Sequence, residues 1–172
     1  IDIHGGGRDL IFPHHENEIA QTEALTGKTF AKYWIHNGLI KVNGQKMSKS
    51  LGNSLVLHDL LEAYHPETIK FALLQTNYRG DINVTDTLFP EAEKHLTGFY
   101  NVIESVYEKF GTDHGDTDSQ GIEDSFKQCM DDDFNTAKAL ANLFGIFKKI
   151  KAKVNTGDNT ATDDVAVLKK TY

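Results

Sequence analysis

Two clusters of side chains could do chemistry, and the first is Pro13-His14-His15-Glu16-Asn17-Glu18. Residues four apart lie on one face of a helix, so His14 and Glu18 would bring an imidazole nitrogen and a carboxylate oxygen to one point. Both donors suit zinc, although two ligands do not complete a tetrahedral site. The same spacing is also typical of a polar helix start, in which Glu16 and Glu18 complement the helix dipole.

The second cluster is the basic run Lys46-Met47-Ser48-Lys49-Ser50, which lies between Gly44 and Gly52. Lysine ammonium groups neutralise phosphate charge, and serine hydroxyls donate hydrogen bonds to phosphate oxygens. The run therefore predicts an anion-binding loop. A solvated basic turn is the alternative.

A third candidate is the run Gly5-Gly6-Gly7-Arg8-Asp9, between an expected strand and an expected helix. Glycine lets a ligand approach the backbone closely, and an aspartate there can accept hydrogen bonds from sugar hydroxyls. A plain tight turn explains the glycines equally well.

The elements that would position these residues follow from local patterns. Residues 1–4 are typical of the end of a buried strand, stopped by the glycines. Pro13 suits the first turn of a helix that runs to about Leu25 and ends at Gly27. Strand character follows at 33–37 and 39–42, and Asn43-Gly44 predicts a tight turn.

The rest of the chain has helical periodicity. Helices are expected over 57–64, from Pro66 onward, and over 85–110, 122–130 and 135–154, with a break at 156–159. The sequence therefore predicts an α/β first third followed by an all-α remainder.

Composition narrows the setting. The chain has 172 residues and a net charge of −7, which argues against broad nucleic-acid binding but not against a local basic patch. It holds no apolar run of the roughly 20 residues that a membrane span needs. The single cysteine, Cys129, excludes an intrachain disulfide and favours a reducing cytoplasm.

The basic run at 46–50 is similar to the signature loop of class I aminoacyl-tRNA synthetases. Together with residues 4–24, 34–53 and 130–140, it makes the chain resemble the cysteinyl-tRNA synthetase family over most of residues 1–145. The resemblance is closest through residue 80.

This resemblance assigns roles to individual residues. It implies that His14 and Glu18 are two of four ligands of a zinc ion that binds the substrate thiolate, the other two being cysteines earlier in the family's sequence. It implies catalytic roles for Lys46 and Lys49. The ATP-binding residues would be Gly7, Asp9, Lys46, Met47, Ser48, Lys49 and Ser50, and the amino-acid pocket would include His4 and His36.

The resemblance also implies a domain order. Residues 1–56 would be the C-terminal part of a Rossmann-type catalytic domain that carries the signature loop. Residues 57–110 would form a helical stem-contact region, 111–121 a linker, and 122–172 the start of a helical anticodon-binding-side domain.

The implied function is ATP- and Mg²⁺-dependent attachment of cysteine to tRNA(Cys) through cysteinyl-adenylate, in the cytoplasm and away from membranes. The segments that resemble the family do not include the N-terminal half of its catalytic domain. We therefore expect the chain to act as part of a longer enzyme and to be inactive alone. Two alternatives stay open: a cysteine ligase of mycothiol synthesis, which the helices after residue 122 disfavour, and a non-catalytic tRNA-binding fragment.

Overall fold

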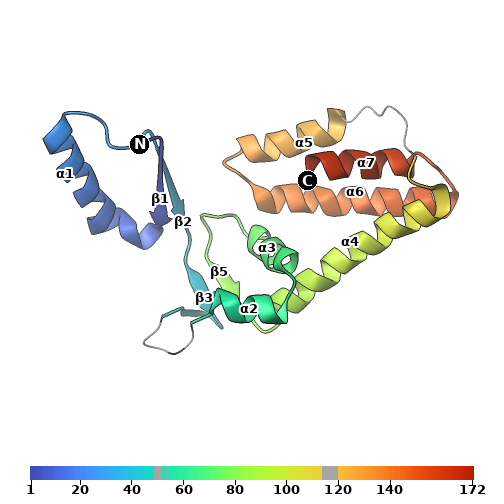
Figure 1. The fold of residues 1–172 in the computed structure, drawn as a ribbon, viewed down its shortest axis with the longest axis horizontal. Helices are drawn as coiled ribbons and strands as arrows, with labels where there is room; N and C mark the ends of the chain where they lie inside the picture. Colours follow the sequence, from blue (N-terminus) through green and yellow to red (C-terminus); the bar gives the residue numbers. More distant parts are fainter. Residues whose placement is uncertain (49–51, 53, 114–119) are drawn as a thin grey trace. The chain divides into compact units, whose positions relative to one another are not determined.

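The computed structural model describes residues 1–48, 52, 54–113 and 120–172 (Figure 1). Within this part, the chain forms two compact units. One comprises Ile1–Leu57 and Tyr78–Thr85, and the other comprises His58–Asn77 and Asp86–Tyr172. The site predictions for Lys49 and Ser50 lie outside the described residues.

The first unit is built on a parallel pair of strands. Strand β1 (Ile3–Gly7) pairs with β2 (Tyr33–Asn37) from Ile3 opposite Tyr33 to Gly7 opposite Asn37. A parallel pair needs a crossover, which helix α1 (Glu16–Thr26) supplies. The prediction that the glycines stop the strand is wrong, because Gly5, Gly6 and Gly7 belong to β1 and pair with β2.

Helix α1 begins later than the sequence predicts. Residues Ile11–His15 form a π-helical turn in which Phe12 is extended, with φ −132° and ψ 133°, and the regular α-helix starts at Glu16. The residue before a proline disfavours the helical region, so Pro13 shapes the turn ahead of the helix instead of beginning it. The predicted end is confirmed: Gly27 caps α1 with φ 65°.

A second small sheet has the order β4-β3-β5. Strands β3 (Ile40–Val42) and β4 (Gln45–Lys46) form a hairpin around the predicted tight turn, whose residues Asn43 and Gly44 have φ values of 50° and 80°. Strand β5 (Ile82–Val84) runs parallel to β3 and was not predicted. It is too short to show an alternating pattern.

The segment that leads into β5 crosses close to Gly38. The Gly38 amide donates to the Tyr78 carbonyl at 2.7 Å, and a Cβ atom on Gly38 would lie 2.0 Å from the Gly80 carbonyl oxygen. No residue with a side chain fits at position 38 without moving the backbone. The crossing therefore requires glycine.

Asp81 joins the segments of the first unit. Its carboxylate accepts the Leu39 amide hydrogen at 2.9 Å and forms ion pairs with Arg8 at 2.7 Å and Lys41 at 2.9 Å. The Leu39 amide and the Lys41 ammonium, helped by Arg8, lower the pKa of Asp81 to about 2. One carboxylate thus ties the end of β1 to β3.

The second unit is helical. Its bounds are α2 (Leu57–Ala63), α3 (Pro66–Leu74), α4 (Leu88–Phe110), α5 (Gln120–Asp131), α6 (Thr136–Thr156) and α7 (Ala161–Thr171). The predicted helices are confirmed to within a few residues, and α4 starts at Leu88 and not at 85, because a turn at Asp86 and Thr87 separates it from β5. The core includes the fully buried Val106, Ile150 and Val165, and Phe99 stacks on Phe147 with 4.2 Å between ring centroids.

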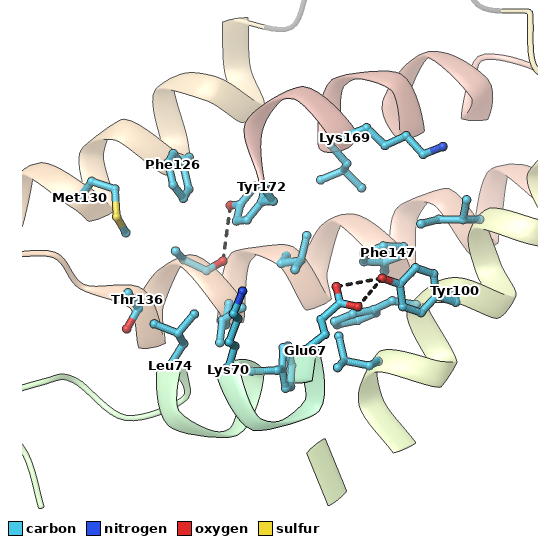
Figure 2. A pocket seen from close by; sticks show the side chains of 18 residues that line it. Glu67, Lys70, Leu74, Tyr100, Phe126, Met130, Thr136, Phe147, Lys169 and Tyr172 are labelled. Atoms are coloured by element: carbon cyan, nitrogen blue, oxygen red, sulfur yellow. Dashed lines mark hydrogen bonds between the residues drawn. The ribbon is translucent and has the colours of Figure 1, made fainter. Parts of the chain in front are cut away.

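A cavity of about 580 Å³ lies among helices of this unit (Figure 2). The Tyr100 hydroxyl donates to both carboxylate oxygens of Glu67, at 2.8 and 2.7 Å, and this bond raises the pKa of Tyr100. The cavity walls are mostly apolar and contain none of the sequence-predicted site residues. Its size alone therefore does not mark the chemical site.

Among the described helices, none is both long and apolar enough to cross a membrane.

The Asp81 ion pairs predict an acid-sensitive first unit. Its folded pKa of about 2 lies below the ordinary 3.8, so the stabilisation is complete above about pH 4 and is lost as the pH falls towards 2. In Asp81→Asn, unfolding of the first unit should depend much less on pH over this range. Fluorescence of Trp34, the single tryptophan, reports on this unit.

Asp2→Asn is the matched control, because the Asp2 carboxylate pairs with Lys32 at an exposed position. It should keep the native pH profile. Equal pH profiles for the native protein and Asp81→Asn would contradict the assigned role.

Candidate functional site

Glu18, in the first turn of α1, lies between two imidazoles. Its Oε2 atom is 2.8 Å from Nε2 of His4 on β1, and its Oε1 atom is 3.6 Å from Nε2 of His14 in the turn before α1. The predicted approach of His14 and Glu18 is therefore present. His4, which was predicted separately as a pocket residue, contacts the same carboxylate.

His15 is the buried member of this cluster, with 3% of its surface exposed. Its Nδ1 atom lies 2.8 Å from Nε2 of His36 on β2. Burial lowers the pKa of His15 below its ordinary 6.5, and the neighbouring His36 and His4 rings lower it further. The structure thus favours a neutral His15 imidazole, the form that binds metals.

Gly6 makes room for the His15 ring. A Cβ atom on Gly6 would lie 2.9 Å from Cε1 and 3.1 Å from Nε2 of His15, and 3.1 Å from Cδ1 of Leu10. The absence of a side chain on β1 at this point lets the imidazole rest on the strand. Packing against His15 therefore explains the glycine at position 6, which the run of glycines in the sequence did not indicate.

Aromatic rings enclose one side of the cluster. Trp34 on β2 stacks on His36 at 5.9 Å with an interplanar angle of 11°, and meets His4 edge-on at 4.9 Å. Phe30 lies 5.2 Å from His4. Packed rings restrict the imidazole rotamers, so the donor atoms are held in place before any ligand arrives.

The donor set fits zinc. One ligand atom each from His4, His15 and Glu18 lie within 4.8 Å of one another. The 3.6 Å between His14 Nε2 and Glu18 Oε1 also fits two ligands of one ion, because each zinc–ligand bond is roughly 2.0–2.2 Å. Imidazole and carboxylate are both ordinary zinc ligands.

His15 is a candidate ligand that was not predicted from the sequence. Its spacing of three residues from Glu18 places it near the same helix face, as the spacing of four does for His14. That spacing could have identified His15, but only the strand beside it shows that the ring is buried.

A second feature joins two motifs that lie far apart in the sequence. The Lys46 ammonium is 3.2 Å from Oδ2 of Asp9, and both side chains are exposed. A Cβ atom on Gly7 would lie 2.5 Å from Oδ1 of Asp9, so that glycine allows the carboxylate to fold back. Met47 and Ser48 are half-buried, and the Leu55 amide donates to the Met47 sulfur at 3.3 Å.

The contact between Gly6 and His15 predicts the effect of one methyl group. In Gly6→Ala, the His15 ring must move away from β1, because contacts near 3 Å to Cβ are too short. Imidazole nitrogen chemical shifts of His15 and His36 should change in NMR spectra, while those of His65 and His95 in the helical unit should not. Unchanged His15 and His36 shifts in a folded variant would contradict this packing.

Comparison with known proteins places the chain in a family. The family model for the catalytic domain of class I (C) tRNA synthetases matches residues 1–94, and a DALR domain model matches residues 125–172. The chain is 46% identical over 154 residues to a cysteine–tRNA ligase of Acinetobacter baumannii, covering 90% of this chain and 33% of that protein. It is 45% identical over 167 residues to the Geobacter sulfurreducens cysteine–tRNA ligase, covering 92% of this chain and 35% of that protein.

Solved structures show the same fold at low sequence identity. A LeuRS–tRNA–LeuAMS complex from Agrobacterium radiobacter matches 99% of this chain and 25% of its own, with a TM-score of 0.78 and 16% identity. Methionyl-tRNA synthetase of Mycobacterium tuberculosis with methionyl-adenylate matches 96% of this chain and 38% of its own, with a TM-score of 0.66 and 16% identity.

The chain spans about a third of the length of the curated relatives it matches. The predicted resemblance and the predicted order of an α/β part followed by helices are both confirmed. This chain belongs to the class I aminoacyl-tRNA synthetase family, in the group described as class I (C).

Proposed function

We propose that this chain takes part in the ATP-dependent attachment of cysteine to tRNA(Cys) through a cysteinyl-adenylate. The observation that carries the proposal is the Glu18 carboxylate set among the imidazoles of His4, His14 and His15. Relatives that share more than 40% of its residues are named cysteine–tRNA ligases, which supports the same substrate.

Cysteine selection would rest on a zinc ion held by His14 and Glu18. When bound, zinc supplies a Lewis acid that takes a thiolate far better than a hydroxyl, which separates cysteine from serine. An apolar pocket alone distinguishes near-isosteres by only about 10–200-fold. His4 orients the Glu18 carboxylate through the 2.8 Å contact, and His36 fixes the ring of His15.

ATP would bind where Asp9 and Lys46 meet. Asp9 accepts hydrogen bonds from the ribose hydroxyls beside Gly7, and the Lys46 ammonium neutralises phosphate charge, together with Lys49 and Mg²⁺. The 3.2 Å ion pair between Asp9 and Lys46 then opens as the nucleotide enters, and each group exchanges its partner for the ligand. The cysteine carboxylate attacks the α-phosphorus, pyrophosphate leaves, and positioning does most of the catalysis.

A tRNA partner is favoured over the amino-sugar of mycothiol synthesis. The helical unit and the DALR domain match at 125–172 support it, because a ligase without tRNA has no use for such a region. A cytoplasmic setting goes with this partner, as does the reduced thiol of the buried Cys129.

The proposal is tested on zinc content and on cysteine activation. Elemental analysis of the chain extended at Ile1 by the residues that precede the matched segment in the Geobacter relative should show zinc that falls at least about tenfold in Glu18→Gln and in His14→Ala. Loss of zinc in His15→Ala with retention in His14→Ala would instead assign the ligand role to His15.

For activation, the residues that precede the matched segment in the Geobacter relative are joined to Ile1, and cysteine-dependent exchange of pyrophosphate into ATP is measured. Lys46→Ala should lower this exchange about 10²–10³-fold. Lys32→Ala, which removes an exposed ammonium from the same unit, is the control. Exchange that serine supports as well as cysteine would refute the proposed specificity.

A further inference from the structure

Helix α6 carries a concentration of positive charge that the chain as a whole lacks. Four lysines lie within six residues, at 148, 149, 151 and 153, in a chain with a net charge of −7. Lys153 is neutralised by Asp164 at 2.6 Å. Lys148 and Lys151, three residues apart and exposed, form no ion pair within the described part of the chain.

Beside these lysines, a notch of about 240 Å³ lies between α4 and α6. Its α6 wall includes Lys151 and Asn155, and its α4 wall includes Asn101 and Ser105. Gly98 adds no side chain on the α4 side, and nothing lies within 4 Å of the position that its Cβ would take. The notch therefore combines an ammonium, two amides and a hydroxyl around open space.

One end of the notch is held in place. The Lys109 ammonium on α4 donates to the carbonyl of Val154, which lines the notch from α6. The Ser105 hydroxyl currently donates to the Asn101 carbonyl in its own helix at 2.7 Å, and it can rotate to serve a ligand. A rigid frame with adaptable donors costs little entropy on binding.

We infer that the notch between α4 and α6 binds a backbone phosphate of an RNA strand, with Lys148 next to it along the strand. This inference rests on the proposed function, since it assigns a contact surface for the tRNA partner. The two phosphate oxygens would accept hydrogen bonds from the Lys151 ammonium and the side-chain amides of Asn101 and Asn155. Such contacts position a nucleic acid without reading its sequence.

The surroundings favour a nucleic acid over an anionic membrane. A membrane-surface helix needs several exposed apolar side chains beside its basic ones, whereas Lys148, Lys151 and Asn155 form a polar row at spacings of three and four residues. Among the described side chains of α6, the one large apolar side chain that is exposed, Phe144, is 37% exposed and packs its ring against His95 and Phe99. Glu104 and Glu108 lie on α4 next to the row of Asn101 and Ser105, so the region of positive electrostatic potential is narrow. A single phosphodiester strand fits such a narrow field better than a flat anionic surface.

The test measures binding of a fluorescein-labelled tRNA(Cys) transcript to the full chain by anisotropy across a salt series. The double variant Lys148→Gln, Lys151→Gln should bind about tenfold more weakly. Its plot of log affinity against log salt should become shallower by about 0.7–0.9 for each lysine removed. Circular dichroism checks that the variant is folded.

The matched control is Lys138→Gln, Lys149→Gln. These two lysines also lie on α6, eleven residues or about three turns apart. They share a face of the helix that differs from the face of Lys148 and Lys151, and the double substitution removes the same charge. The control should lose at most a small part of the affinity. Equal losses in both double variants would overturn the inference, because net charge and not the notch would then govern binding.

Three further outcomes separate the possible failures. If the transcript does not bind the unaltered chain, the tRNA partner of the proposed function fails as well as the notch. If the transcript binds and the notch variant binds equally well, only the notch inference fails. If vesicles of phosphatidylserine bind and lose binding in the notch variant while the transcript does not, the site belongs to a lipid surface and the inference is overturned.

Discussion

The imidazole of His15 rests directly on a strand that carries no side chain at Gly6, and the candidate site depends on this close approach. With any larger residue at position 6, Cβ would meet the ring at 2.9 Å. Because the ring can lie there, it is buried next to His36 and within one ligand cluster with His4 and Glu18. The glycine at position 6 of the strand thus determines where the His15 ring and its donor atoms lie.

Carboxylates then organise the cations of the first unit. Asp81 forms ion pairs with Arg8 and Lys41, which joins the end of β1 to β3. Asp9 forms an ion pair with Lys46 at the end of the hairpin. The two pairings differ in kind. Asp81 is also held by a backbone amide and serves the fold, whereas the side chains of Asp9 and Lys46 are exposed, so a ligand can reach both.

Much of this arrangement follows from local sequence patterns, and the rest depends on tertiary neighbours. The spacing of four residues predicted that His14 would approach Glu18, and Asn43-Gly44 predicted the tight turn, because both effects act within a few residues. Strand β5, the inclusion of the glycines in β1 and the burial of His15 depend on partners about 10–40 residues away in the chain. The cavity among the helices shows the converse, since it encloses about 580 Å³ and none of the predicted site residues lines it.

Glu18 and its neighbouring imidazoles are proposed to hold a zinc ion that accepts a thiol, and the proposed function depends on this ion. X-ray absorption of the zinc-loaded chain tests this claim most directly. Alone, the metal should show only nitrogen and oxygen neighbours at roughly 2.0–2.2 Å; with cysteine, a sulfur neighbour should appear at about 2.3 Å, and with serine none should. A spectrum that cysteine leaves unchanged would contradict the account.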